Sequence, residues 1–210
     1  MARKINNIKA NNEFLIITNG KQSEYNYFSL IKKFKSIYDI TVKFENGGPL
    51  ELVEYAIAQS NLEEYNQIWI VFDVDQTHVE NKFIPAIKKA EKNNIKYAFS
   101  NIAFEVWLLS HYSKFSKHSS AKELQNKMDE LLKQLKCKSE YTKNDDKLLE
   151  KYFIEKYQTA VDNSKIVFQT KLKHHNEFYG KHIPPKYWEW NSCTNVFKLV
   201  EAMKLEKKFD

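Results

Sequence analysis

The chain has 210 residues, of which 42% are hydrophobic and 29% charged, and this composition suits one folded core with room for an extension. Only 4 glycines are present, and neither a GxGxxG nor a GxxxxGK(S/T) sequence occurs, which excludes the common glycine-rich phosphate-binding loops. The net charge of +6 indicates a polyanionic partner, nucleic acid first, although the lysines are spread along the chain as in a generally Lys-rich proteome.

Cysteine usage and the N-terminus bear on where the protein works. Cys137 and Cys193 lie far apart in the sequence and form no CxxC pair, which is typical of a reducing compartment. The first residues contain no apolar signal segment, and no apolar stretch is long enough to cross a membrane. We therefore expect a cytoplasmic protein without membrane contact.

The first half of the chain alternates short apolar runs with amphipathic segments. The runs at residues 14–18 and 68–72 are continuous, which is typical of strands buried on both faces. Strict alternation of strand and helix predicts right-handed crossovers and a mainly parallel sheet flanked by helices. The expected strands cover residues 14–18, 40–44, 68–72 and 95–99, and the expected helices cover 24–34, with Ser23 as a possible N-cap, 50–60 and part of 77–94.

After Asn101 the pattern changes to helices. Residues 102–112 are apolar nearly all round, which predicts a buried helix with Asn101 as its N-cap. Further helices are expected over residues 121–136, capped by Ser119-Ser120, from Asp145 or Asp146 to about 164, and over 195–204, with a loop over 174–190 that contains His174 and His175. We therefore divide the chain into an α/β domain over residues 1–112 and a helical extension over 113–210 that packs on it.

Two carboxylates, Asp73 and Asp75, follow the third expected strand. Ligands of an open parallel sheet bind at the carboxyl ends of its strands, and residues two apart on a strand point to the same side. Two like charges held so close favour a bound cation that prefers oxygen ligands, Mg²⁺ or Mn²⁺. The alternative is a helix cap and a turn residue after a strand. The first and third strands both end in polar turns, which places residues 19–24 at the same edge.

Several segments together resemble a known family. Residues 18–28 resemble the EGxxTExxYF opening of RloB-like proteins, Val71–Asp75 matches their VFDxD, and residues 100–112 match their SNPxFExWLLxHF. Residues 137–143 and 191–200 also look like later blocks of the family. The resemblance extends from about Phe14 to the C-terminus.

The resemblance implies a TOPRIM-like α/β domain with a helical extension, found in bacterial abortive-infection and restriction-associated loci, often beside an ATPase partner. It implies a metal-dependent nuclease in which Asp73 and Asp75 bind Mg²⁺. The family's glutamate after the first strand is replaced here by Asn19, which can coordinate weakly through its carbonyl but cannot take a proton. Glu24 could supply the third carboxylate as ligand or base, the alternative being an acid favourably placed at a helix N-terminus.

Three more residues are candidates for the site. Glu105, the one acid in an apolar segment, must be paired, protonated or metal-bound; it could complete the catalytic carboxylates or be a buried structural acid bonded to a helix terminus or a Lys or Arg. His111 could contact a phosphate or hold the helix in place, although such a histidine is more often a satisfied core or surface residue. Lys21 could contact a phosphate, the alternative being a solvated turn lysine.

The leading hypothesis is a Mg²⁺- or Mn²⁺-dependent nuclease acting on DNA or RNA in antiphage defence. The alternative is a non-catalytic TOPRIM-like subunit that binds nucleic acid or a partner and regulates an associated ATPase or nuclease. A third, weaker hypothesis is hydrolysis of small nucleotides at the same edge of the sheet. An ATPase encoded nearby and a second copy of the chain are the candidate protein partners.

Overall fold

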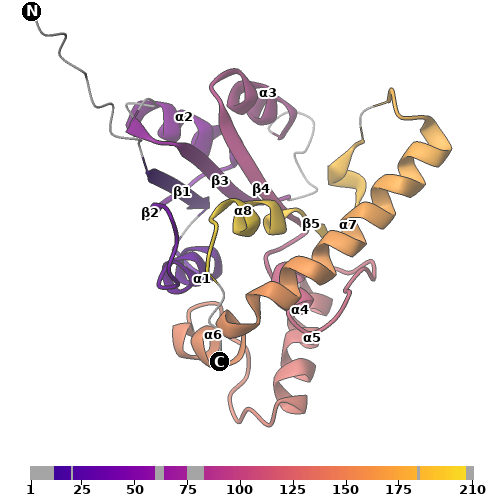
Figure 1. Ribbon diagram of the computed structural model, residues 1–210. Coiled ribbons are helices and arrows are strands. Elements are labelled where there is room, and N and C mark those ends of the chain that lie inside the picture. The colour runs from indigo at the N-terminus through magenta and orange to yellow at the C-terminus, as the bar shows by residue number, and fades with distance from the viewer. Residues whose placement is uncertain (1–11, 20, 60–63, 75–82, 184, 207–210) are drawn as a thin grey trace, which may run out of the picture.

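The structure is a computed structural model that describes residues 12–19, 21–59, 64–74, 83–183 and 185–206 (Figure 1). One sheet of five strands has the order β2-β1-β3-β4-β5. The strands are β1 (Glu13–Asn19), β2 (Asp39–Glu45), β3 (Gln67–Asp73), β4 (Ile95–Asn101) and β5 (Cys193–Thr194). The first four strands are parallel to one another, and β5 is antiparallel to β4.

Helices cover both faces of this sheet. Helices α2 (Pro49–Gln59) and α3 (Ile84–Lys92) pack side by side on one face, and α1 (Ser23–Ile31) and α8 (Val196–Ala202) pack on the other (Figure 1). Right-handed crossovers require this division, because the chain leaves β1 toward one edge of the sheet and then returns across it. The predicted class, a mainly parallel TOPRIM-like sheet flanked by helices, is confirmed.

The remaining helices follow β4 in the chain. They are α4 (Glu105–Ser110), α5 (Ala121–Gln134), α6 (Asp146–Tyr152), the 3₁₀ turns η3 (Ile154–Lys156) and η4 (Tyr187–Glu189), and α7 (Tyr157–Tyr179). The segment after Tyr112 returns to the sheet through β5 and α8, and the predicted domain boundary at that residue stays a prediction. Within the described residues, none of the helices combines the length and the apolar character needed to cross a membrane.

The prediction that β1 and β3 are buried on both faces is confirmed. Five consecutive residues of β1, Phe14–Thr18, are buried, and so are five of β3, Ile68–Phe72. Their neighbours in the sheet and the helices on both faces exclude water from them, and their continuous apolar sequence follows from this position. The carboxyl ends of β1 and β3, Asn19 and Asp73, therefore emerge next to each other at one edge of the core.

Helix boundaries differ from the predictions at several places. Asn101 does not cap a helix, because it is the last residue of β4 and pairs with Cys193 of β5; α4 begins only at Glu105. Ser23 lies inside α1, after the N-cap position held by Gln22. Residues 174–179, expected in a loop, belong to α7, which contains no glycine or proline and ends before Gly180, where φ is +84°.

The predicted helix from Asp145 or Asp146 to 164 is interrupted. Asp145 caps α6 by accepting a hydrogen bond from the backbone of Leu148, and α6 ends at Tyr152. The chain then makes the turn η3 before α7 begins. The start of α5 is as predicted, because Ser120 and Glu123 form a reciprocal capping box around it.

Candidate functional site

A cleft of about 750 Å³ lies at the carboxyl ends of β1 and β3. Asn19 and Asp73 line it, together with residues 102–103, the start of α5, Lys143 and Asn191. The prediction that Asn19 and Asp73 share one edge of the sheet is confirmed. Asp75, the second carboxylate of the predicted pair, lies outside the described residues.

Three predicted acids converge beside this cleft. Asp73 ends β3, Glu24 stands in the first turn of α1, and Glu105 stands in the first turn of α4. Glu24 is only 8% exposed and Glu105 3% exposed. Oδ1 of Asp73 is buried and has no hydrogen-bond partner within the described part of the chain. A buried carboxylate oxygen without a donor is costly, so this position favours a proton or a cation.

Burial and nearby negative charges shift Glu24 and Asp73 toward their protonated forms. The pKa of Glu24 is raised from 4.5 to about 7, chiefly by burial and in smaller part by the charge of Glu105, whereas a backbone hydrogen bond at Glu24 and the charge of Lys143 oppose the shift. Burial likewise raises the pKa of Asp73 well above its ordinary value, and the charges of Glu24 and Glu105 add to the effect. The cluster therefore holds more negative charge than its surroundings stabilise.

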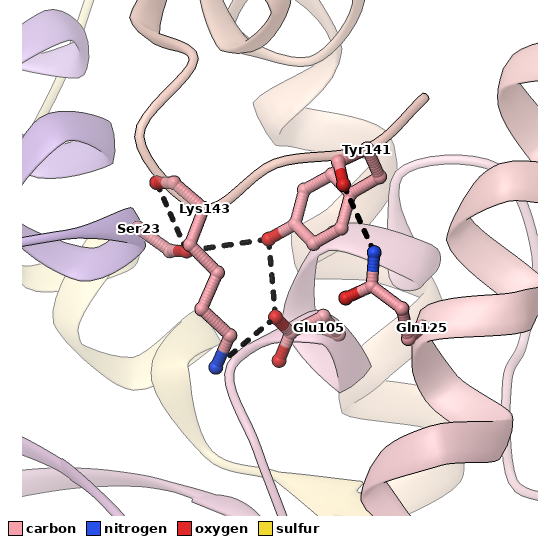
Figure 2. A network of polar contacts seen from close by, with 5 residues as sticks. All are labelled: Ser23, Glu105, Gln125, Tyr141 and Lys143. Atoms are coloured by element: carbon pink, nitrogen blue, oxygen red, sulfur yellow. Dashed lines mark hydrogen bonds and ion pairs between the residues drawn. The ribbon is translucent and has the colours of Figure 1, made fainter.

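One cation already touches the cluster. Nζ of Lys143 lies 3.4 Å from Oε1 of Glu105, and the same oxygen accepts a hydrogen bond of 3.1 Å from the hydroxyl of Tyr141 (Figure 2). Burial alone would lower the pKa of Lys143, but the three carboxylates Glu105, Asp73 and Glu24 together raise it. Lys143 therefore stays positively charged at neutral pH. Glu105 is buried and paired with this charge, which is one of the states expected for an acid in an apolar segment.

Sequence reasoning missed Tyr141 and Lys143 because they lie in the loop between α5 and α6, far from every predicted site residue. The hydroxyl of Tyr141 lies 3.2 Å from Oγ of Ser23, which also donates to the carbonyl of Lys143 at 3.4 Å. This explains why Ser23 is buried inside α1 instead of capping it. The available signal was the resemblance of residues 137–143 to a family block.

The two remaining candidates lie elsewhere. His111 is buried, with Nε2 3.0 Å from the hydroxyl of Tyr27 and Nδ1 donating to the carbonyls of Trp107 and Leu108. Burial lowers the pKa of His111 to about 3, so it is a neutral core residue that holds α4, and this position favours the structural alternative over phosphate contact. Lys21 is exposed, with Nζ 5.3 Å from the centre of the Phe44 ring.

The side chains at the cleft offer the kind of oxygen atoms that a magnesium-type cation prefers, but they are only partly arranged to hold one. Carboxylate and amide oxygens, which Glu24, Asp73 and Asn19 offer, are the ligands that Mg²⁺ and Mn²⁺ prefer. Glu105 fits less well, because Lys143 and Tyr141 already hold its Oε1. Across the described ranges, which omit Asp75, no group of three His, Cys, Asp or Glu side chains is arranged to hold a metal ion.

A mainly parallel sheet with an acidic cleft at the ends of adjacent strands is the arrangement expected of a TOPRIM-like protein. The family described as RloB-like protein matches residues 14–203, which is most of the chain. The protein therefore belongs to the RloB-like family. The comparisons with curated proteins and with solved structures found no match.

Proposed function

We propose that this protein is a metal-dependent nuclease that hydrolyses phosphodiester bonds of DNA or RNA in the bacterial cytoplasm as part of antiphage defence. The observation that carries the proposal is the interaction of Glu24 with Asp73, which lines a cleft and has a buried oxygen that lacks a donor among the described residues. The family resemblance supports the defence role, and an ATPase encoded nearby is the partner that we propose with it.

Each residue has a role in this proposal. Asp73 and Asp75 would hold Mg²⁺ or Mn²⁺, with Asn19 as a weak additional ligand. The chemistry supplied by such a cation would be activation of a water molecule and neutralisation of phosphate charge. Glu24, whose pKa of about 7 suits proton transfer near neutral pH, would accept the proton of the attacking water if it does not itself ligate the cation.

The direct test is a cleavage screen with single- and double-stranded DNA and RNA in Mg²⁺, in Mn²⁺ and in EDTA. We expect at least one substrate to be cut in the presence of either cation and none to be cut in EDTA. The double variant Asp73→Ala/Asp75→Ala, checked for folding by circular dichroism, should cut nothing. Equal cleavage by the double variant, or no cleavage of any substrate by the wild type, would contradict the proposal.

A second function competes with the first because of two observations. Asn19 stands where the family has a glutamate, and Oε1 of Glu105 is already engaged by Lys143 and Tyr141. Both features weaken a metal site. They favour a non-catalytic TOPRIM-like subunit that binds nucleic acid or a partner and regulates an associated ATPase or nuclease. Self-association into a homo-oligomer is compatible with either function.

Restoring a carboxylate at residue 19 distinguishes these two functions. We expect Asn19→Glu to raise Mn²⁺ affinity at least about tenfold, because unit charges about 4 Å apart near a protein surface interact by about 4 kcal/mol. Calorimetric titration measures this affinity, and Asn19→Gln is the neutral control. Cleavage that is absent in the wild type and gained in Asn19→Glu would identify a degenerate natural site. Cleavage present in both at similar rates would show that Asn19 does not limit an active enzyme.

A further inference from the structure

The ammonium of Lys143 faces two environments. On one side it is 3.4 Å from Glu105, a carboxylate that is 3% exposed. On the other side it reaches the cleft, since the Lys143 side chain is 46% exposed and lines the same space as Asp73 and Asn19. An ammonium has three N–H donors, and the ion pair with Glu105 leaves donors for a ligand in the cleft.

The backbone that carries Lys143 is held on several sides. Ser23 of α1 donates to the carbonyl of Lys143 at 3.4 Å. Two residues earlier, the carbonyl of Tyr141 accepts from Gln125 of α5 at 2.9 Å (Figure 2). The N–H of Tyr141 donates to Asp129 of α5 at 2.8 Å. The ion pair with Glu105 also restricts the side chain, so Lys143 loses less conformational entropy when it binds than a free surface lysine does.

The charges at this cleft have opposite effects on an anionic ligand. Glu24, Asp73 and Glu105 would repel a phosphate that approached the cleft, whereas a lysine ammonium is a compact positive charge of the kind that binds phosphate oxygens. We propose that Lys143 binds a phosphate group of the nucleic acid that occupies this cleft. This inference rests on the proposed function, because it takes the cleft to be where the phosphodiester lies. The competing role is a purely structural counter-ion for buried Glu105.

Three variants separate these roles. Lys143→Met removes the charge and keeps the length of the side chain, and Lys143→Arg keeps the charge. Lys143→Met/Glu105→Gln removes both charges, so that no unpaired buried carboxylate destabilises the fold. The matched control is Lys165→Met on α7, because Lys165 is 41% exposed and also pairs with a glutamate, Glu201, at 2.6 Å, outside the described lining of the cleft.

The measurement is the binding of a fluorescein-labelled single-stranded oligonucleotide, followed by anisotropy at several salt concentrations. In this assay we use Ca²⁺ in place of Mg²⁺, because Ca²⁺ also prefers oxygen ligands. We expect Lys143→Met and the double variant to bind about tenfold more weakly. Their plots of log affinity against log salt should be shallower by about 0.7, the value for one phosphate contact on a single strand. Lys143→Arg should stay near the wild type in affinity and in slope.

The outcomes separate this inference from the proposed function. Wild-type affinity and slope in the double variant would overturn the inference and leave Lys143 a structural counter-ion. An equal loss in Lys165→Met would also overturn it, because the effect would then be one of net charge. A wild type that binds the oligonucleotide through Lys143 but cleaves nothing in Mg²⁺ or Mn²⁺ would support the inference and contradict the nuclease function.

Discussion

Replacing Asp73 with asparagine is expected to weaken Mn²⁺ binding at least about 100-fold. Loss of a second-shell partner of a metal ligand already costs about 10–100-fold, and Asp73 would be a ligand itself. Its Oδ1 is buried with no donor among the described residues, and Asn is nearly isosteric while carrying no charge. Isothermal titration calorimetry of the wild type and Asp73→Asn measures the effect, and any cleavage should fall with it.

The control for this prediction is Asp39→Asn, a change of the same kind at an exposed residue that begins β2. It lies at the opposite end of the strands from the cleft, and we expect it to leave Mn²⁺ binding unchanged. Unfolding does not confound the comparison, because removing a buried, repelled charge at Asp73 should stabilise the fold. Mn²⁺ binding by Asp73→Asn at wild-type strength would show that the cation does not use the end of β3.

Replacing Glu24 with glutamine is expected to stabilise the protein at pH 8 in EDTA, by up to about 3 kcal/mol in the free energy of unfolding. Burial raises the pKa of Glu24 from 4.5 to about 7, so the folded state binds its proton more tightly than the unfolded state does. Wild-type stability should therefore fall as the pH rises from about 4.5 to about 7, and the full penalty remains above that range. Glutamine removes this penalty, and the two proteins should converge below about pH 4.5.

Urea unfolding at pH 4.5, 6 and 8 measures this difference. The control is Glu150→Gln, because Glu150 forms an exposed pair with Lys33 at 3.2 Å and such pairs contribute only about 0–1 kcal/mol. A glutamine variant with the same pH dependence as the wild type between pH 4.5 and 8 would mean that Glu24 is not the acid that titrates there. A cation added to the wild type should restore the stability that the repelled charges cost.

Much of the fold could be predicted because strong local signals agree with the tertiary structure. The apolar runs that became β1 and β3 are buried on both faces as expected, and their parallel pairing brings Asn19 and Asp73 together. Strand β5 escaped prediction because two residues, Cys193 and Thr194, carry no periodicity. Asn101 misled the prediction because a good capping residue can equally end a strand, and pairing with β5 decides which occurs.

The residues of the candidate site could be predicted where they stand at the end of a strand or at the start of a helix. Glu24, Asp73 and Glu105 each stand at such a position, so topology alone brings them together. Lys143 and Tyr141 stand in a loop, where no periodicity fixes a position. Their place depends on the packing of α5 against α4, which a single sequence does not encode in any local pattern.

The contact between α1 and the α5–α6 loop joins two parts of the chain that are synthesised at different times. Ser23 and Tyr141 are 118 residues apart, yet their hydroxyls lie 3.2 Å from each other. Ribosomes add about 5–20 residues per second, so several seconds of synthesis separate the two sides of the cleft. A nascent chain thus has Glu24 and Asp73 before it has Lys143. If Lys143 is the phosphate-binding group, a chain that has not yet reached Lys143 lacks this contact and would bind its target at this cleft more weakly than the finished protein does.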